Sequence, residues 1–561
     1  MPNLTQPRPS ATVLFLTILF ISAALFFFRL GDRSFRNPDE GRYAEIAREM
    51  VVSGNWIEPK IYGVDYLKKP ALFYWLTAFF FKVFGFNEWA GRSVPALFGL
   101  LGVLTTFWFA RKILNEKAAF LSSLVLTSNF WYLEVGRYLV IDAVFAFFTV
   151  SGLYCFYIAA HSQKRKLFYY FLFYVCVALS FLAKGVLGVI LPGISIALYL
   201  WLTKKMSAVL REMRLELGVL IFSLIALPWF VIISLKEPEF LKLFFLHENF
   251  SRFASVAFEH QEAWYFYLIL TPVILIPWSL FWKPLARSMP WSDTTTDPWK
   301  DQKIFVLTTS LSMVLFFSLS RAKLLTYILP SVPFFSIFIG GAWAQWQESP
   351  RKKEAEFSWK EYVPVLLLIF LGLAAILAIP KVIARFGQEL PAGVGIYFQW
   401  MGAAVLVGGV TVLGVLRRRN ITHLFYALVF TMVLFSLAFT FAMERMNDDY
   451  TTRHFALSLK PKLRPGDRVF IYDHPGAMYE FGFYLNAPVT LVGLEGELEL
   501  SRQDPENRKA TVTQEQFKEM LKNKEKIYCL ARKSDFLEME QNLGKNLVVI
   551  QEDRRKVLFS T

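Results

Sequence analysis

The composition of this 561-residue chain excludes a protein made of several soluble domains. Apolar residues make up 55% of the chain, charged residues 19%, and phenylalanine alone fills 57 positions, which is more apolar surface than a soluble fold can bury. Lysine and arginine exceed aspartate and glutamate by 15, and because these cations lie between apolar runs they indicate cytosolic loops rather than nucleic-acid binding. The chain is therefore predicted to cross a membrane many times.

Apolar runs in chain order predict about 13 transmembrane helices. They begin near Ala11, Ser93, Ala118, Asp142, Leu167, Gly185, Leu217, Ala263, Ile304, Leu324, Tyr362, Tyr397 and Ile421. We interpret the first as an uncleaved helix rather than a signal peptide, because no small-residue cleavage site follows it. Basic residues gather in alternate connections, such as Lys164–Lys166 and Arg417–Arg419, which the positive-inside rule places in the cytosol. An odd number of crossings from a cytosolic start leaves the C-terminus outside.

Three long segments then fall on the exterior side, namely residues 31–92, 236–262 and 444–561. In the last segment, turn signals separate short β-rich runs at Val469–Tyr472, Pro488–Val492, Lys526–Leu530 and Asn546–Gln551. A helix is predicted from Gln514 to Asn523. We therefore divide the chain into a transmembrane domain, 1–443, and a small exterior α/β domain, 444–561. No phosphate-binding glycine loop is present in the sequence, which argues against a nucleotide substrate.

The first exterior segment contains a dense group of charged side chains, Asn37-Pro-Asp-Glu-Gly-Arg-Tyr-Ala-Glu45. The stretch from 40 to 52 has an apolar stripe and predicts an amphipathic helix along the membrane surface. Pro38 favours an extended residue before it, which would let Asp39 cap this helix. Asp39 is thus either a helix cap alone or a functional carboxylate, and its local sequence leaves both roles open.

Other polar side chains are predicted at the exterior ends of several segments. They are Arg42, Tyr43, Tyr66 and Lys69 in the first loop, Arg137 and Asp142 around the next turn, and Lys323 and Tyr327 at the tenth span. As alternatives to a site, Lys69 would reach toward lipid headgroups and Arg137 would form a structural pair with Asp142. Cations on this side run against the positive-inside rule, and an anionic ligand such as a phosphate is the economical reason for them.

These motifs together resemble those of the GT-C glycosyltransferases. The segment Asn37–Glu45 is the most specific, followed by the turn Tyr66-Leu-Lys-Lys-Pro70, the Arg252-Phe loop and the start of the tenth span. The nearest branch is the bacterial lipid A aminoarabinose transferases, related to protein O-mannosyltransferases, and the likeness extends over most of the chain. It implies an inverting transfer of a sugar such as 4-amino-4-deoxy-L-arabinose from a polyprenyl phosphate, namely undecaprenyl phosphate, to lipid A or a related glycolipid.

The resemblance also implies roles for particular residues and a location. Asp39 matches the catalytic carboxylate, and Asp142 matches a second acid at the mouth of the cavity. Positions near the carrier phosphate, the catalytic acid or the cavity are matched by Arg42, Tyr43, Tyr66, Lys69, Arg252 and Tyr327. Arg137 and Lys323 are further donor-binding candidates, because both are cations predicted to lie on the exterior side of the membrane. The protein is expected to be a monomer of the bacterial inner membrane with its active site facing the periplasm.

The case for a metal rests on the second exterior loop. His247, Glu248 and His260 form a possible ligand set there. Members of the family often carry a metal-binding glutamate before the Lys-Pro pair, whereas this chain has Lys68, which cannot ligate. We therefore expect no obligatory cofactor, with zinc as the possible divalent metal.

The chemistry expected of Asp39 depends on the acceptor. If the acceptor is a hydroxyl, Asp39 would act as the general base. If the acceptor is an anionic lipid A phosphate, Asp39 would orient that phosphate or balance the positive charge that develops on the sugar. Three alternatives stay open: a GT-C transferase of hexose, hexuronic acid or mannose to glycolipid or protein, a transporter of lipid-linked sugar, and a membrane scaffold. Transport is disfavoured because the charges gather at one face and no clear internal repeat is visible.

Overall fold

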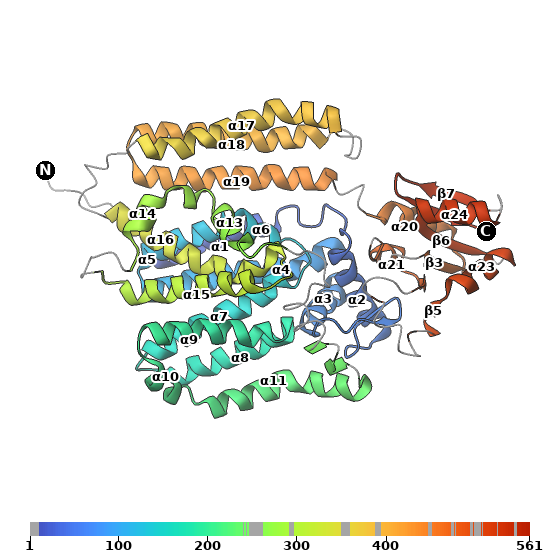
Figure 1. The fold of residues 1–561 in the computed structure, drawn as a ribbon, viewed down its shortest axis with the longest axis horizontal. Helices are drawn as coiled ribbons and strands as arrows, with labels where there is room; N and C mark the ends of the chain where they lie inside the picture. The colour runs from blue at the N-terminus through green and yellow to red at the C-terminus, as the bar shows by residue number, and fades with distance from the viewer. Residues whose placement is uncertain are drawn as a thin grey trace. The chain divides into compact units, whose positions relative to one another are not determined.

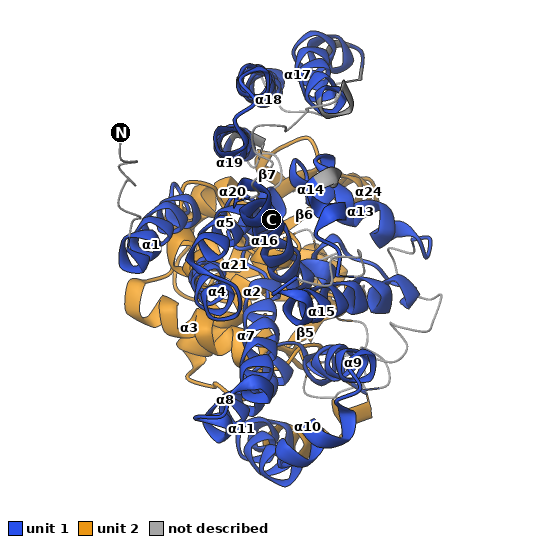
Figure 2. Cartoon of the chain, turned by 90° about the vertical axis from the view of Figure 1, so that its left-hand side faces the viewer, with its two compact units in different colours: residues 1–30, 95–231, 245–446 blue, residues 31–94, 232–244, 447–561 orange. Residues whose placement is uncertain are grey.

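The computed structural model describes residues 10–238, 240–242, 244–245, 262–290, 297–348, 359–386, 394–446, 451–472, 476, 478–493, 498, 507, 509–523, 526–543 and 547–561. The chain forms two compact units, which Figure 2 shows in different colours. Unit 1 takes in residues 1–30, 95–231 and 245–446, and unit 2 takes in residues 31–94, 232–244 and 447–561. The predicted first loop and the C-terminal segment thus share unit 2, and the domain division at residue 444 stays a prediction.

Unit 1 is built of helices. In chain order they are α1 (Ala11–Phe27), α4 (Glu88–Ile113), α5 (Glu116–Thr127), α6 (Phe130–Val135), α7 (Asp142–His161), α8 (Lys166–Lys184), α9 (Leu187–Leu202), α10 (Met206–Glu212), α11 (Leu215–Lys236), α13 (Phe266–Ile274), η2 (Trp278–Leu280), α14 (Trp282–Arg287), α15 (Lys300–Leu319), η3 (Leu325–Ser331), α16 (Val332–Glu348), α17 (Trp359–Phe386), α18 (Val394–Arg417) and α19 (Ile421–Met446). Helices α4 and α11 each extend into unit 2. Helices α17, α18 and α19 lie side by side, and so do α7, α8 and α9 (Figure 1).

Many of these helices are apolar enough for a bilayer. Among the described residues, 9 helices have the length and composition to cross a membrane, and α1, α9 and α3 (Leu72–Phe84) are shorter apolar helices. The multi-pass architecture is confirmed, whereas the count of thirteen stays a prediction. The run that begins at Ala118 is interrupted, because α5 ends at Thr127 and Asn129 starts α6 by accepting a hydrogen bond from Tyr132 N at 2.9 Å.

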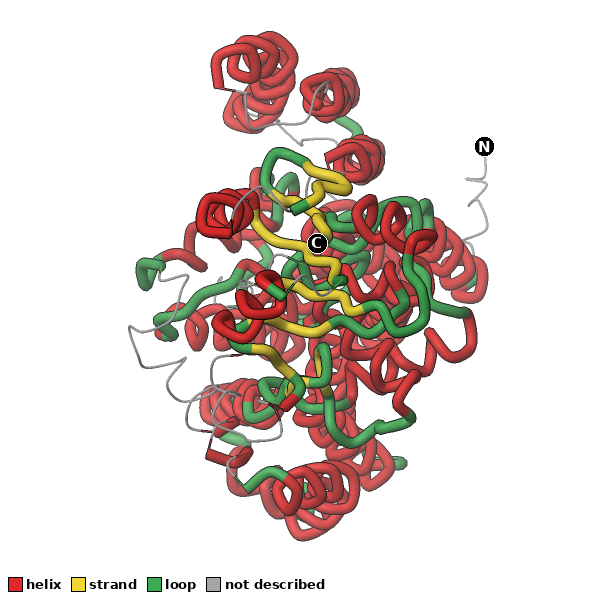
Figure 3. Tube along the Cα trace, turned by 90° about the vertical axis from the view of Figure 1, so that its right-hand side faces the viewer, coloured by secondary structure: helices red, strands yellow, loops and turns green. Residues whose placement is uncertain are grey.

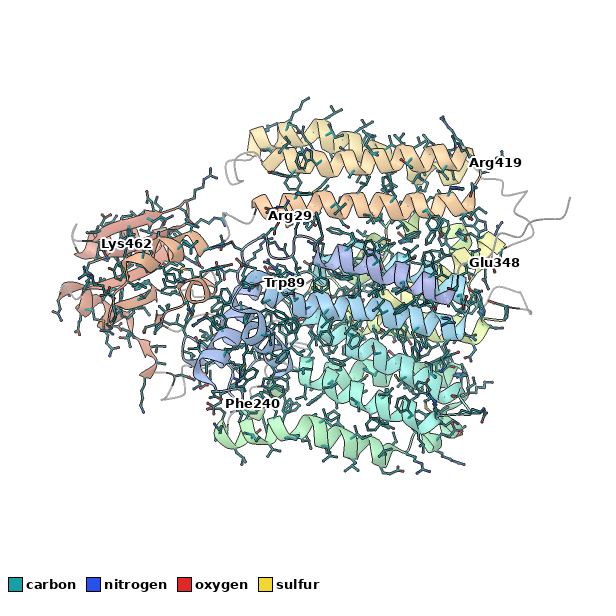
Figure 4. The ribbon with its side chains drawn as sticks, turned by 180° about the vertical axis from the view of Figure 1, so that it is seen from behind. Arg29, Trp89, Phe240, Glu348, Arg419 and Lys462 are labelled. Atoms are coloured by element: carbon teal, nitrogen blue, oxygen red, sulfur yellow. The ribbon has the colours of Figure 1, made fainter. Side chains whose placement is uncertain are left out.

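The basic turns predicted to be cytosolic are found at one end of unit 1. Figure 4 shows Arg419 and Glu348 at that end and Arg29 nearer the other end of the helices. Lys117, in the first turn of α5, lies 3.6 Å from the Glu348 carboxylate. Helix α10 and its flanking turns lie at the same end in Figure 1. This distribution agrees with the positive-inside pattern, while the orientation in the membrane stays a prediction.

Unit 2 begins with the first exterior loop. Helix α2 (Asp39–Ser53) is the predicted amphipathic helix, and a short hairpin of β1 (Lys60–Ile61) and β2 (Val64–Asp65) follows it before α3. The second predicted exterior loop, 236–262, lies largely outside the described residues. The polar residues of the first loop are therefore positioned by α2 and the hairpin.

The C-terminal part of unit 2 is the predicted α/β domain. Its strands are β3 (Arg468–Tyr472), β4 (Thr490–Val492), β5 (Thr511–Val512), β6 (Ile527–Arg532), β7 (Val548–Glu552) and β8 (Lys556–Ser560). Its helices are α20 (Arg453–Leu459), η7 (Lys460–Lys462), α21 (Phe481–Leu485), α23 (Gln514–Lys522) and α24 (Lys533–Leu543). The sheet order is β5-β4-β3-β6-β8-β7, with the first four strands parallel and β8 antiparallel to both neighbours (Figure 3). Phe470, Phe517 and Phe559 pack in its core, which is why the apolar β-rich runs fold as a buried sheet.

Candidate active site

Asp39 is the first residue of α2 and does not cap it. The capping position is held by Pro38, which has no side-chain acceptor, so the interpretation of Asp39 as a helix cap alone is wrong. The Asp39 carboxylate instead accepts a hydrogen bond from Arg42 Nη2 at 2.5 Å, across the first turn. Its side chain is 47% exposed, against 7% for Arg42. The helix therefore presents an accessible carboxylate that is oriented by a buried cation.

Two tyrosines hold the Arg42 guanidinium in place. Its Cζ lies 5.3 Å from the ring centroid of Tyr43 and 5.5 Å from that of Tyr66, within the range of cation–π attraction. Both rings are buried, and Tyr66 follows the β1–β2 hairpin. The structure thus brings together four of the predicted residues, namely Asp39, Arg42, Tyr43 and Tyr66. Lys69 lies in the next turn of unit 2 and is half-buried.

A fully buried ion pair that sequence analysis missed fixes the start of α2. Arg92, in the first turns of α4, contacts both carboxylate oxygens of Glu40 at 2.7 Å, and neither side chain is exposed. Arg92 also donates to the carbonyls of Arg33 at 2.6 Å and Ser34 at 2.9 Å. Glu40 reaches back to accept from Arg36 N at 3.0 Å. The chain before Asp39 is therefore tied to α4 by charge-assisted hydrogen bonds.

The C-terminal segment around α21 supports the same helix from another side. Tyr484 OH accepts from Phe35 N at 2.7 Å and donates to Glu88 at 3.0 Å. A Cβ atom added to Gly41 would lie 2.5 Å from Asn37 Oδ1 and 2.9 Å from Glu480 N, so only glycine allows this approach. The C-terminal domain and the first loop therefore form one packed body within unit 2.

The far end of α2 carries a second buried charge cluster. Glu45 accepts from Arg48 at 2.8 and 2.6 Å, and Glu49 accepts from the backbone N–H groups of Tyr62 and Gly63 at 2.5 and 3.2 Å. Burial, with added repulsion from Glu45, raises the pKa of Glu49 to about 8. This end of α2 is thus anchored on the hairpin rather than solvated.

A separate polar group lies within unit 1. Asp142, the first residue of α7, accepts from Lys184 Nζ at 2.5 Å, and both side chains are largely buried. The ammonium group lies 4.7 Å from the ring centroid of Tyr327 and 5.3 Å from that of Phe145. Lys184 is not among the predicted site residues, although its place directly before Gly185, which has a φ of 71°, is a signal in the sequence for a tight turn. The acid expected to pair with Arg137 thus has Lys184 as a partner.

Two predicted cations contact backbone carbonyls. Arg137 donates to the carbonyls of Leu25 at 2.6 Å and Phe28 at 2.8 Å, at the end of α1. Lys323 donates to the carbonyls of Ser320 at 2.5 Å and Glu262 at 2.9 Å, and desolvation lowers the pKa of its ammonium group. These contacts favour a structural role, and donor binding by either residue stays a prediction.

The remaining predicted residues lie outside the described residues. They are Arg252 and the possible metal ligands His247, Glu248 and His260. Across the described ranges, no group of three or more histidine, cysteine, aspartate or glutamate side chains could hold a metal ion. The possible zinc site therefore stays a prediction.

Comparisons with known proteins agree over much of the chain. Residues 11–244 match the family of dolichyl-phosphate-mannose-protein mannosyltransferases. The undecaprenyl phosphate-alpha-4-amino-4-deoxy-L-arabinose arabinosyl transferase of Aeromonas hydrophila is 30% identical over 406 residues, 71% of this chain and 72% of the relative. Transferase 2 of that name from Proteus mirabilis is 30% identical over 367 residues, 64% of each chain. The crystal structure of ArnT from Cupriavidus metallidurans bound to undecaprenyl phosphate aligns with a TM-score of 0.84 over 98% of both chains, at 24% identity.

Proposed function

Because this chain belongs to the family of the undecaprenyl phosphate-aminoarabinose arabinosyl transferases, we propose that it moves 4-amino-4-deoxy-L-arabinose from undecaprenyl phosphate to lipid A or a related envelope glycolipid. The fold likeness to ArnT confirms the expected GT-C architecture. The observation that carries the proposal is the Asp39–Arg42 pair at the start of α2, within the segment by which the sequence resembles this family. A half-exposed carboxylate that is oriented by a buried cation can contact a substrate directly.

The proposed reaction is a displacement at the anomeric carbon. An oxygen of the acceptor forms a bond to the anomeric carbon. At the same time the bond between that carbon and the oxygen of the carrier phosphate breaks, and undecaprenyl phosphate leaves with the electron pair. A phosphate acceptor brings its own negative charge, so Asp39 orients it or balances positive charge on the sugar. With a hydroxyl acceptor, the proton would pass to Asp39.

Fixed cations stabilise the phosphate as it departs. Lys69, Arg42 and Arg252 are the candidates, and of these Arg252 lies outside the described residues. A preorganised donor aimed at developing charge typically contributes about 2.7–4 kcal/mol.

The location of the reaction is part of the proposal. We propose that residues 1–443 perform the transfer in the bacterial inner membrane and that the active site and the domain 444–561 face the periplasm. The gathering of basic turns at one end of unit 1 supports this orientation. We propose that the protein acts as a monomer.

The test is a transfer assay with purified protein in lipid vesicles. Lipid A and undecaprenyl phosphate-linked aminoarabinose are supplied, and the product is detected as a mass increase of one aminoarabinose. Asp39→Asn should reduce transfer at least about 10²-fold, the scale of a general-base or charge-balancing effect. Asp32→Asn, the same charge change at an exposed position of the same loop, is the matched control.

Two outcomes would overturn the proposal. One is transfer from a nucleotide-linked sugar in the absence of any lipid carrier. The other is transfer by Asp39→Asn at the rate of Asp32→Asn, which would remove the carboxylate from the reaction.

A further inference from the structure

Unit 1 contains a cavity whose lining includes none of the predicted site residues. It has a volume of about 700 Å³ and lies between the end of α9 and the short helix α10. Its lining includes Trp201, Leu202, Lys204, Met206, Ser207 and Leu210. A cavity of roughly 300–1,000 Å³ with mostly apolar walls and few polar groups is typical of a ligand site.

The apolar wall of the cavity is open to the surroundings. Trp201 is 68% exposed and Leu202 50%, at the end of the apolar helix α9, and Leu210 in α10 is 40% exposed. In a chain that crosses a membrane, exposed tryptophan at a helix end is typical of the interface between hydrocarbon and headgroups. The exposed apolar wall is therefore suited to contact lipid at headgroup depth.

Lys204 differs from its basic neighbours in its pairing. Lys205 contacts Asp301 at 3.1 Å, and Lys166 contacts Glu212 at 2.7 Å. Within the described parts of the chain, Lys204 has no acidic partner within ion-pair distance, and it is exposed at the cavity wall. The cavity is thus apolar with one uncompensated cation beside it.

The turn that carries Lys204 is held in one shape. Lys204 has a φ of 57°, and Lys205 N donates to Leu200 O at 3.0 Å to close the end of α9. Asp301, which contacts Lys205, also accepts from Tyr199 at 2.9 Å. The position of the cation relative to the apolar wall is therefore set by the fold rather than by a loose loop.

We propose that this cavity binds an anionic phospholipid, with an acyl chain against Trp201, Leu202 and Leu210 and the lipid phosphate at Lys204. Basic pockets beside membrane helices, on the side where basic turns gather, suit anionic headgroups of the cytosolic leaflet. An acyl chain is of a size that such a cavity can hold, whereas an undecaprenyl chain is far larger. The inference does not depend on the proposed transfer reaction, because it uses none of its residues.

The test is native mass spectrometry of the full chain, purified in a neutral detergent and incubated with phosphatidylglycerol or phosphatidylcholine. Phosphatidylglycerol should be retained preferentially. Lys204→Ala should reduce that retention about fivefold, which corresponds to about 1 kcal/mol for one lysine near a lipid surface. Arg418→Ala, which removes an exposed cation next to Arg419 and outside the cavity wall, should change nothing.

The outcomes separate the proposal from its rivals. Equal retention of the two phospholipids would overturn it, and so would equal losses in Lys204→Ala and Arg418→Ala, which would indicate general surface charge. Displacement of phosphatidylglycerol by undecaprenyl phosphate in the wild type, but not in Lys204→Ala, would overturn it in favour of a polyprenyl site. Leu210→Glu, which places a like charge beside the lipid phosphate, should also abolish the preference.

Discussion

Replacing Glu40 by glutamine should separate stability from catalysis at the start of α2. Glu40 and Arg92 are both completely buried, and the two contacts between them are 2.7 Å long. Glutamine keeps the size of the side chain but leaves the guanidinium of Arg92 without its counter-charge. Removing one partner of a buried ion pair destabilises a protein by about 3–5 kcal/mol. Arg92 keeps its hydrogen bonds to the carbonyls of Arg33 and Ser34 in this variant. We therefore expect the free energy of unfolding to fall by about 3 kcal/mol, the lower value of that range.

The assay is thermal unfolding of purified protein in detergent, followed by intrinsic fluorescence. Glu40→Gln should unfold at a clearly lower temperature than the wild type. Asp39→Asn, one residue away, should unfold at the wild-type temperature, because that carboxylate is about half exposed and forms one i,i+3 pair. Asp39→Asn should thus lose transfer and keep its stability, whereas Glu40→Gln should lose stability.

A double variant tests whether the loss of stability comes from the unpaired charge of Arg92. If the penalty arises from an uncompensated buried charge, Glu40→Gln combined with Arg92→Met should recover a large part of the lost stability. Wild-type stability of Glu40→Gln, or a double variant no better than the single one, would refute the claim that this pair holds α2 on α4.

Two further predictions concern other parts of α2. The folded-state pKa of Glu49 is raised from 4.5 to about 8, so its contribution to stability is fully present below pH 4.5 and is lost as the pH rises to 8. Glu49→Gln should therefore flatten the pH dependence of the unfolding temperature across that window, and an unchanged slope would contradict the shift. Gly41→Ala should push α2 away from Glu480, where the added Cβ would lie 2.9 Å from the backbone nitrogen. A displacement of about 1 Å near the reacting carboxylate can reduce transfer about 10²-fold, whereas Gly414→Ala, with no atom within 4 Å of the new Cβ, should have no effect.

Local patterns in the sequence were sufficient for much of the fold. The β-rich runs at 469–472 and 526–530 are strands β3 and β6, and the predicted helix from 514 is α23, which begins with a capping box at Thr513. These features depend on residues close together in the chain. The apolar run that begins near Ala118, by contrast, is broken at Ser128 and Asn129, because the serine caps the end of α5 and the asparagine caps the start of α6. A short polar break inside an apolar run changes hydropathy little but redirects the backbone.

In the candidate site, too, contacts between residues close in sequence were predictable and contacts between distant residues were not. Asp39 and Arg42 are three residues apart on a helix, so their contact follows from helical geometry. Glu40 and Arg92 are 52 residues apart, and Asp142 and Lys184 are 42 apart. Such pairs depend on how helices pack, which a single sequence does not reveal, and the capping role of Asp39 failed because Pro38 occupies that position instead.

The packing of unit 2 suggests why a transferase of this architecture carries a C-terminal sheet domain. Helix α2 is too polar to be held by a bilayer alone, and its two ends are fixed by Arg92 and by the hairpin. Tyr484, from the C-terminal domain, accepts from Phe35 N, four residues before Asp39, and so limits the movement of the backbone that leads into the helix. The domain therefore acts as a rigid support for the carboxylate, because preorganisation of such a group depends on the shell around it rather than on the group itself.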